Sequence, residues 1–426
     1  MNIKKIVDDL KNCPCGRQHT VDLKAVEIAS GLLKKSANIL KKCGFPDKIL
    51  VVADNNTLKA SKGLLDVLKS GGFTARLKLY DDFKTPTESE VNEIVALSAD
   101  VEGILSVGTG SLNDICRRAA LLADKEFAIF ATAPSMDGFA SGTAPIIVDG
   151  IKETLPARQP SIIIADTQIL ASAPSVLKSA GFGDIIGKYI ALVDWRVANL
   201  LTGEYYCENI ANLVRDALRR MTAMCDRVTQ NDEGVAGFIM ETLILTGIAM
   251  HLANCSRPAS GAEHQISHFI GMKQLSAGKV SDFHGKKVGV ATVALAKIYH
   301  NLATITPEFS EERTNLEKVI SAYGERHKDF ILSVNEPSIC DEVSVEKLKK
   351  EWHKIQKIIT EELPSYEDLL EVMIRSGSAT GFDEISVEGS LAEQALRYHS
   401  FMRRKVVLTR MLAMTDVDIC SLLKEA

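Results

Sequence analysis

Short apolar segments alternate with segments of helical periodicity over the first 131 residues. Each apolar segment is followed by turn residues, as expected of buried strands linked to helices. Such alternation predicts a parallel sheet covered by helices on both faces. The expected strands are 49–54, 75–80, 103–107 and 127–131, and the expected helices include 88–99 and 112–123.

The pattern changes twice further along the chain. Residues 142–166 contain the apolar runs 146–148 and 161–164 with prolines between them, which predicts extra strands or a β-ribbon. After residue 166 nearly every segment has helical periodicity, including 174–201, 210–225 and 235–254. We therefore expect a Rossmann-like α/β domain over 1–165 and an all-helical domain over 166–426.

Composition excludes several classes of protein. A net charge of −5 over 426 residues, with no lysine- or arginine-rich block, argues against nucleic-acid binding. We find no signal-peptide core at the N-terminus and no run of about 18 apolar residues, so we expect a cytoplasmic protein without a membrane span.

Nine scattered cysteines favour reduced thiols over a disulfide scaffold. Cys13 and Cys15 lie close to His19 in the sequence, but a second ligand pair at the spacing of a zinc finger is missing. A hairpin with two buried thiols is the favoured interpretation, and a zinc site is the alternative.

A glycine-containing turn follows the third expected strand. It contains Gly108, Thr109, Gly110 and Ser111, and a helix begins with Leu112, Asn113 and Asp114. Glycines let backbone N–H groups approach a pyrophosphate, and a helix N-terminus adds oriented donors. The turn therefore predicts a dinucleotide site. It is not the Gly-x-Gly-x-x-Gly fingerprint after the first strand, so an ordinary Rossmann dehydrogenase is disfavoured.

Two other strand ends support this prediction. Thr132, Ala133, Pro134 and Ser135 follow the fourth expected strand, and ligands of open α/β sheets gather at that edge. Asp54 ends the first strand, where a carboxylate can bind a ribose and favour NAD over NADP. The alternative for Asp54 is a helix cap or turn residue.

One carboxylate and three imidazoles indicate a metal site. His264 and His268 are four residues apart, which places both on one face of a helix. His284 lies in another segment, and Asp184 lies in what we interpret as a glycine-rich break inside helical sequence. Spacing does not decide between His264 and His268 as the ligand. The donor set suits zinc, ferrous iron or nickel.

These motifs resemble a known superfamily, that of iron-dependent alcohol dehydrogenases, glycerol dehydrogenases and dehydroquinate synthases. Residues 132–141, 257–264 and 284–289 look like the signature of the sn-glycerol-1-phosphate dehydrogenases within it. The Cys-x-Cys-Gly-x-x-His stretch looks like their bacterial, AraM-type branch. Two departures are Thr109, where relatives usually have a third glycine, and Met136, where relatives often have histidine.

The resemblance implies a role for each group of residues. The dinucleotide would contact Asp54, Gly108, Gly110, Ser111, Leu112, Asn113, Asp114, Thr132, Ala133, Pro134, Ser135 and Ser141. The metal would be bound by Asp184, His264 and His284. Substrate binding and catalysis would involve Asp137, Asp184 and His268. Arg257 and Lys286 are candidates for binding the substrate phosphate, with solvated helix-end charges as the alternative.

The implied activity is the reversible NAD(P)H-linked reduction of glycerone phosphate to sn-glycerol 1-phosphate. It would require one divalent metal ion, with zinc or nickel expected and iron as a further candidate. The resemblance also implies a homodimer that works in phospholipid biosynthesis. The main alternative is a glycerol or polyol dehydrogenase of the same superfamily, which acts on an unphosphorylated substrate.

Overall fold

The computed structural model describes residues 3–83, 85–148 and 150–424, which form two compact units. Unit 1 comprises the described residues up to Ile185 together with Arg219–Asn254. Unit 2 comprises Ile186–Leu218 and the described residues from Cys255 onward.

A six-stranded parallel sheet forms the centre of unit 1, with the strand order β1-β8-β5-β4-β2-β3. Four of its strands were expected from the sequence, and the α/β fold class is confirmed. The strands are β1 (Ala25–Ala29), β2 (Lys48–Asp54), β3 (Thr74–Tyr80), β4 (Gly103–Gly108), β5 (Glu126–Ala131) and β8 (Ile162–Asp166).

The segment 142–166 is divided between two sheets. The strands β6 (Thr143–Val148) and β7 (Ile151–Pro156) pair antiparallel and form the expected ribbon. By contrast, β8 joins the main sheet between β1 and β5. All five of its residues are buried, which suits a central parallel strand covered on both faces.

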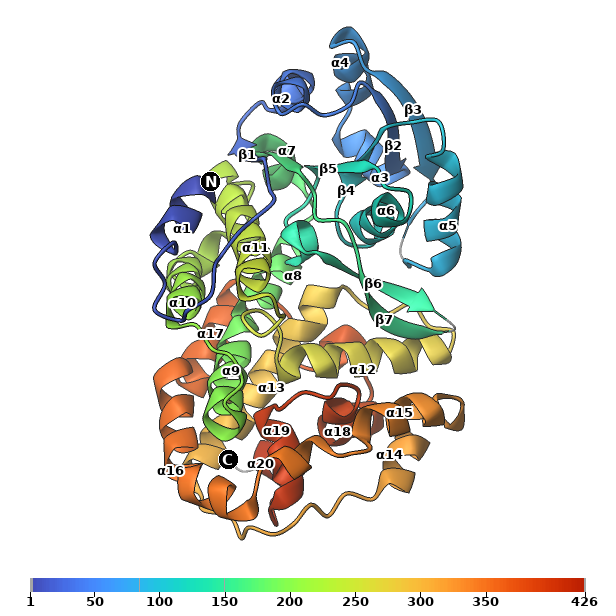
Figure 1. Ribbon diagram of the computed structural model, residues 1–426. Coiled ribbons are helices and arrows are strands. Elements are labelled where there is room, and N and C mark those ends of the chain that lie inside the picture. Colours follow the sequence, from blue (N-terminus) through green and yellow to red (C-terminus); the bar gives the residue numbers. More distant parts are fainter. Residues whose placement is uncertain (1–2, 84, 149, 425–426) are drawn as a thin grey trace. The chain divides into compact units, whose positions relative to one another are not determined.

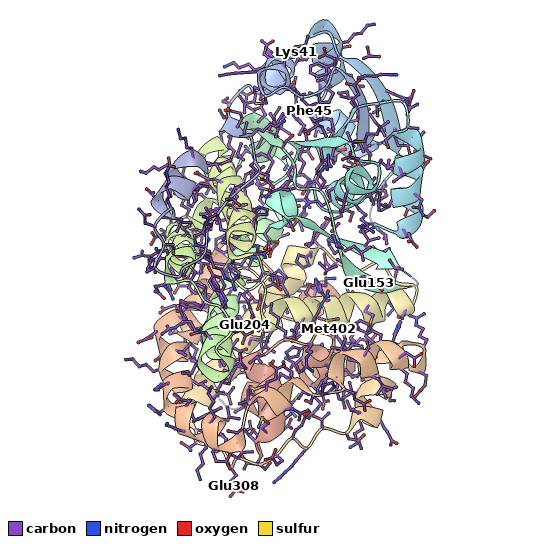
Figure 2. All side chains as sticks on the ribbon, viewed as in Figure 1. Lys41, Phe45, Glu153, Glu204, Glu308 and Met402 are labelled. Atoms are coloured by element: carbon purple, nitrogen blue, oxygen red, sulfur yellow. The ribbon has the colours of Figure 1, made fainter. Side chains whose placement is uncertain are left out.

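Several helices of unit 1 pack on this sheet. In Figure 1, α6 lies beside β4 and packs against α5. One sheet face is filled by apolar side chains such as Val51, Leu105 and Phe130. Phe45 lies inside this unit and Lys41 on its outer side (Figure 2). The helices are α1 (Ile3–Asp9), α2 (Ser36–Lys42), α3 (Asn55–Ala60), α4 (Leu64–Ser70), α5 (Glu88–Leu97), α6 (Gly110–Leu122), α7 (Thr167–Ser172), α8 (Ser175–Ile186) and α11 (Glu233–Ala253).

Helix α11 belongs to unit 1 although it follows the sheet by many residues. It packs on α7, β1 and β8, and a Cβ at Gly237 would lie 3.0 Å from the Thr167 side chain. By length and composition α11 is apolar enough to cross a membrane, yet 78% of its most apolar window is buried inside the protein. The boundary between the two compact units therefore follows Ile185, and not the change of sequence pattern near residue 165.

Unit 2 is helical, with a core formed mainly by α9, α12, α13 and α16. Met402 is buried in this unit, and Glu308 lies exposed at its surface (Figure 2). Its helices are α9 (Lys188–Thr202), most of α10 (Glu208–Thr222), α12 (Ala262–Ser276), α13 (His284–Thr304), α14 (Leu316–Tyr323), α15 (Lys328–Asn335), α16 (Val345–Glu362), α17 (Tyr366–Arg375), α18 (Gly389–Tyr398), α19 (Leu408–Met411) and α20 (Ile419–Lys424).

Candidate active site

The carboxyl ends of β2, β4 and β5 meet at one edge of the sheet in unit 1. The chain passes from β2 to β3 on one side and then returns to β4 on the other side of β2. This reversal is the topological switch point of a doubly wound sheet, where ligands of such folds bind. The predicted cofactor residues Asp54, Gly108 and Thr132 lie at or directly after these three strand ends.

The turn after β4 has the local geometry expected of a phosphate loop. Gly110 has a positive φ of 44°, which favours glycine. Gly108 leaves room for Leu112, whose side chain would lie 2.7 Å from a Cβ at that position. Thr109 is extended, and its Oγ1 is 2.8 Å from Ser135 Oγ. This hydrogen bond joins the turn to the segment after β5, so Thr109 has a structural role that a glycine would lack.

Asp54 is a helix cap in this structure. Its Oδ1 accepts a hydrogen bond of 2.8 Å from the backbone N–H of Thr57, and a capping box is complete. Its Oδ2 accepts a longer bond of 3.4 Å from Phe83 N–H. The structure therefore confirms the alternative that Asp54 is a helix cap, and ribose binding by Asp54 stays a prediction.

The predicted residues Asn113 and Asp114 are buried on α6. Asn113 Oδ1 accepts a hydrogen bond from Ser106 at 2.7 Å. Burial raises the pKa of the Asp114 carboxyl to about 6, although the guanidinium of Arg117 acts in the opposite direction. The sequence alone did not indicate that Arg117 is fully buried.

Arg117 holds the segment that follows the predicted substrate residue Asp137. Its guanidinium donates to the carbonyl oxygens of Phe139 at 3.4 Å and Ser141 at 3.0 Å. The carbonyl groups therefore anchor Ser141 to α6. The sequence offers one signal for this anchoring role of Arg117. The arginine lies one helical turn after Asn113, in a helix expected to cover the sheet.

Asp184 lies on a continuous helix, so the prediction of a glycine-rich break at this point is wrong. Helix α8 runs through Gly181, where a Cβ would lie only 1.9 Å from the carbonyl oxygen of Pro134. The glycine is therefore required for close packing, not for a turn. Asp184 is fully buried, and its Oδ2 accepts a hydrogen bond of 2.9 Å from the backbone N–H of Asp137.

Three imidazoles gather in unit 2. His264 and His268 lie on α12, as the spacing predicted, and His284 is the first residue of α13. The ring centroids are 5.1 Å apart for His264 and His284, and 5.7 Å apart for His268 and His284. Such a cluster of imidazoles from two helices suits a transition-metal site.

Glu263 contacts a predicted metal ligand, although the sequence did not single it out. Its fully buried carboxylate lies 2.6 Å from Nδ1 of His264 and accepts a hydrogen bond from Gly261 N–H. A carboxylate on Nδ1 fixes the tautomer in which Nε2 carries the lone pair. The acidic residue directly before a candidate metal ligand was the available signal.

Asp194 is a second buried carboxylate, and it interacts electrostatically with Glu263. Asp194 accepts hydrogen bonds from Tyr299 Oη at 2.9 Å and from the N–H of Ala262 at 2.8 Å. Burial, together with the charge of Glu263, raises the pKa of the Asp194 carboxyl to about 6. This network holds the first turn of α12, which carries His264.

The chain is similar to known proteins over most of its length. The model of the iron-containing alcohol dehydrogenase family matches residues 27–174. A glycerol-1-phosphate dehydrogenase [NAD(P)+] of Bacillus velezensis is 36% identical over 313 residues, which cover 70% of this chain and 78% of the relative. One of Bacillus subtilis is 34% identical, covering 77% and 86%. The chain belongs to the glycerol-1-phosphate dehydrogenase family. The solved structure of a probable glycerol dehydrogenase from Sinorhizobium meliloti has the same fold, with a TM-score of 0.62 and 15% identity, covering 94% of this chain and 95% of that one.

In this member of the glycerol-1-phosphate dehydrogenase family, the two candidates for binding a substrate phosphate are already engaged. Arg257 is 3% exposed and pairs with both carboxylate oxygens of Glu204. Lys286 donates to Asp282 at 2.7 Å and is partly buried. Arg257 therefore stabilises the fold and is not a solvated charge, and its assignment as a phosphate ligand is not supported.

Proposed function

We propose that the protein catalyses the NAD(P)H-linked reduction of glycerone phosphate to sn-glycerol 1-phosphate, and the reverse reaction. The observation that carries this proposal is the similarity to proteins named glycerol-1-phosphate dehydrogenase [NAD(P)+] at 36% and 34% identity. The alternative of a polyol dehydrogenase has weaker support, because the solved structure with that description is 15% identical and supports the fold alone.

The dinucleotide binds at the switch point of the sheet in this proposal. Gly108, Thr109 and the first residues of α6, from Gly110 to Asp114, receive the pyrophosphate. The segment from Thr132 to Ser135, with Ser141, borders the nicotinamide side, and Asp54 borders the ribose. The hydrogen bond between Thr109 and Ser135 supports this arrangement because it joins the two segments of unit 1 that would hold one ligand.

We assign the metal to Asp184, His264 and His284. The chemistry of these residues fits a divalent ion. Asp184 is fully buried, and a carboxylate oxygen is a common ligand of zinc and related divalent ions. Nδ1 of His264 is held by Glu263, which leaves Nε2 as the ligand atom. Zinc and nickel suit two imidazoles and one carboxylate, and iron does as well.

A bound metal would supply Lewis-acid polarisation of the substrate carbonyl. Side chains of the protein would bind the substrate and deliver the proton. The backbone N–H of Asp137 orients the Asp184 carboxylate. We assign the Asp137 side chain to binding of the substrate. Reduction of a carbonyl consumes one hydride and one proton. We assign His268 to the hydrogen bond with the reacting oxygen, through which the proton arrives.

The substrate assignment is tested with purified protein and NADH or NADPH. We expect turnover with glycerone phosphate and little with glycerone, and a product that is sn-glycerol 1-phosphate by chiral analysis. Equal turnover of the two ketones would overturn the assignment in favour of a polyol dehydrogenase. Formation of the sn-3 enantiomer would also contradict it.

The metal assignment is tested by replacing His284 with alanine, with His353→Ala as the control. His353 is exposed on α16 of the same unit. We expect H284A to lose the catalytic metal and activity together, and H353A to keep both. Full activity in H284A would refute the role of His284.

Three further statements complete the proposal. The protein works in the cytoplasm, assembles as a homodimer and supplies glycerol phosphate for phospholipid biosynthesis. The homodimer and the role in phospholipid biosynthesis follow from the family resemblance, and size-exclusion chromatography with light scattering tests the dimer directly.

A further inference from the structure

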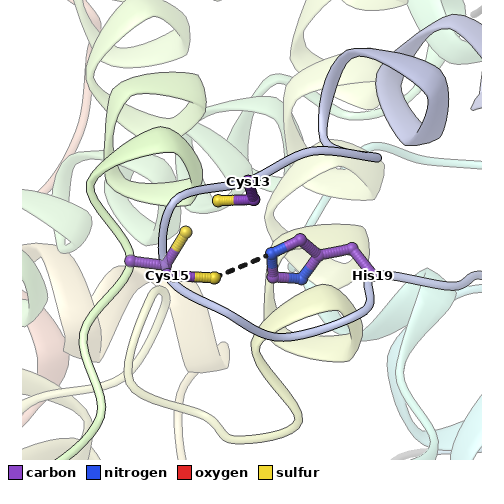
Figure 3. A group of neighbouring side chains, drawn as sticks. Cys13, Cys15 and His19 are labelled. Carbon is purple, nitrogen blue, oxygen red and sulfur yellow. Dashed lines mark hydrogen bonds between the residues drawn. The ribbon is translucent and has the colours of Figure 1, made fainter.

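A loop near the start of unit 1 gathers three metal-binding side chains that the proposed reaction does not use. Ligand atoms of Cys13, Cys15 and His19 all lie within 4.8 Å of one another. Figure 3 shows the three side chains on one loop, with Cys15 Sγ directed at the imidazole. The distance from Sγ of Cys15 to Nε2 of His19 is 3.2 Å.

The local sequence explains why the thiols come together. Gly16 N–H donates to Cys13 O at 3.2 Å, which closes a tight turn over residues 13–16. Pro14 occupies the second position of this turn, where its fixed φ is favourable. Gly16 has a φ of 77°, which glycine adopts at little cost. The turn thus holds two cysteines two residues apart.

His19 is held in the tautomer that a metal ligand requires. It is 5% exposed, and its Nδ1 lies 2.8 Å from the carbonyl oxygen of Leu252. Because a carbonyl oxygen only accepts, Nδ1 carries the proton and Nε2 has the lone pair. Nε2 is the nitrogen that faces Cys15. Zinc-bound histidines are fixed in the same way, by an acceptor on the ring nitrogen that does not bind the metal.

We propose that Cys13, Cys15 and His19 bind a zinc ion. Zinc–sulfur bonds of about 2.3 Å and zinc–nitrogen bonds of about 2.0 Å place tetrahedral ligand atoms roughly 3.5–3.8 Å apart. The observed spacing needs only small side-chain rotations to match. Two thiolates and an imidazole form a soft donor set that suits zinc. The fourth position is taken by water or another side chain.

The structure revises the sequence interpretation at this loop. The expected hairpin would bury both thiols, yet Cys13 and Cys15 are only partly buried, whereas His19 is buried. Burial of two apolar thiols therefore does not account for the turn. Their proximity to an oriented imidazole points to a shared ligand.

The zinc site has a structural role in this proposal. The last carbonyl groups of a helix lack partners within the helix. At the end of α11, His19 bonds the carbonyl oxygen of Leu252 and Arg17 that of Ala253, at 2.8 Å and 3.5 Å. A metal that fixes His19 thus holds the N-terminal segment on α11. The proposal does not depend on the proposed activity.

The test begins from the H284A protein, which lacks a ligand of the proposed catalytic metal. We expect about one zinc per chain by elemental analysis, and a thiolate-to-cobalt charge-transfer band after cobalt exchange. In the same background, C15S and H19Q should lose this zinc and the band. C43S is the matched control, since Cys43 is another partly buried thiol of unit 1, and it should keep both.

A second measurement on the wild-type protein covers the case in which a variant fails to fold. Cys13 and Cys15 should resist alkylation until a chelator is added, as followed by peptide mass spectrometry. Absence of zinc and of the cobalt band in H284A would overturn the proposal. So would alkylation that a chelator does not change, or a disulfide between Cys13 and Cys15. Activity loss in H284A reports on the catalytic metal alone, so the two proposals fail separately.

Discussion

Replacing Gly181 by alanine tests how tightly α8 packs against the segment after β5. A Cβ at this position would lie 1.9 Å from Pro134 O and 2.9 Å from Pro134 C. Carbon–oxygen contacts usually begin at about 3.3 Å, so one backbone segment must move by roughly 1.4 Å. Neither neighbour can rotate away, because the contact is with backbone.

Two opposing effects decide the outcome. Alanine favours a helix interior over glycine by about 1 kcal/mol. Overpacking of a rigid contact costs about 1–3 kcal/mol and sometimes more. Since the overlap here is severe, we expect the clash to prevail and the unfolding free energy to fall by about 2 kcal/mol. The displaced segment includes Ser135, and a shift of about 1 Å near a reacting group can lower kcat/KM by about 100-fold.

Urea denaturation and NADH-dependent kinetics measure these two effects. The control is Gly389→Ala at the start of α18, where a Cβ meets nothing within 4 Å. It should be neutral or more stable by up to about 1 kcal/mol. If G181A is as stable as the wild type and keeps its kcat/KM, the packing argument is refuted.

Two further predictions concern buried carboxylates. Glu263→Gln should weaken metal binding about 10- to 100-fold, because it removes the carboxylate that orients His264. Chelator competition measures the metal affinity, and an unchanged affinity would contradict the orienting role of Glu263. Asp114 has a folded-state pKa of about 6, above the ordinary 3.8, so the folded state binds more protons between these values and stability falls as pH rises from about 4 to 6. Asp114→Asn should remove about 2 kcal/mol of this pH dependence between pH 4.5 and 6.5, as measured by urea denaturation at these two pH values. The same pH dependence in both proteins would show that Asp114 does not titrate in this range.

The fold was largely readable from the sequence because each central strand has a short apolar run of its own. The strands β2, β4 and β5 were expected within one residue of their observed ends. The edge strand β1 was not, since Ala25–Ala29 is mostly half-buried or exposed and therefore lacks an apolar run. The place of β8 in the main sheet could not be read either, because pairing of distant strands leaves no local signal.

The chemistry of the candidate site was more readable than the packing that supports it. Spacing placed His264 and His268 on one helix face, because helical periodicity is a local property. Gly181 was interpreted as a break because a glycine-rich segment commonly ends a helix. Its actual role depends on Pro134, which is 47 residues away in the sequence and beyond any local pattern.

The same reasoning separates two kinds of charged residue. Arg257 lies close in sequence to the metal motif, which suggested that it binds the substrate phosphate. Its guanidinium instead donates a hydrogen bond to Glu204, which is distant in the sequence. Arg117 and Glu263 gave no such suggestion, yet each orients a segment that carries predicted site residues. A side chain's type and its sequence neighbours thus indicate which chemistry it can perform. Its long-range hydrogen-bond partners decide whether the group is available for a ligand or is already used to position one.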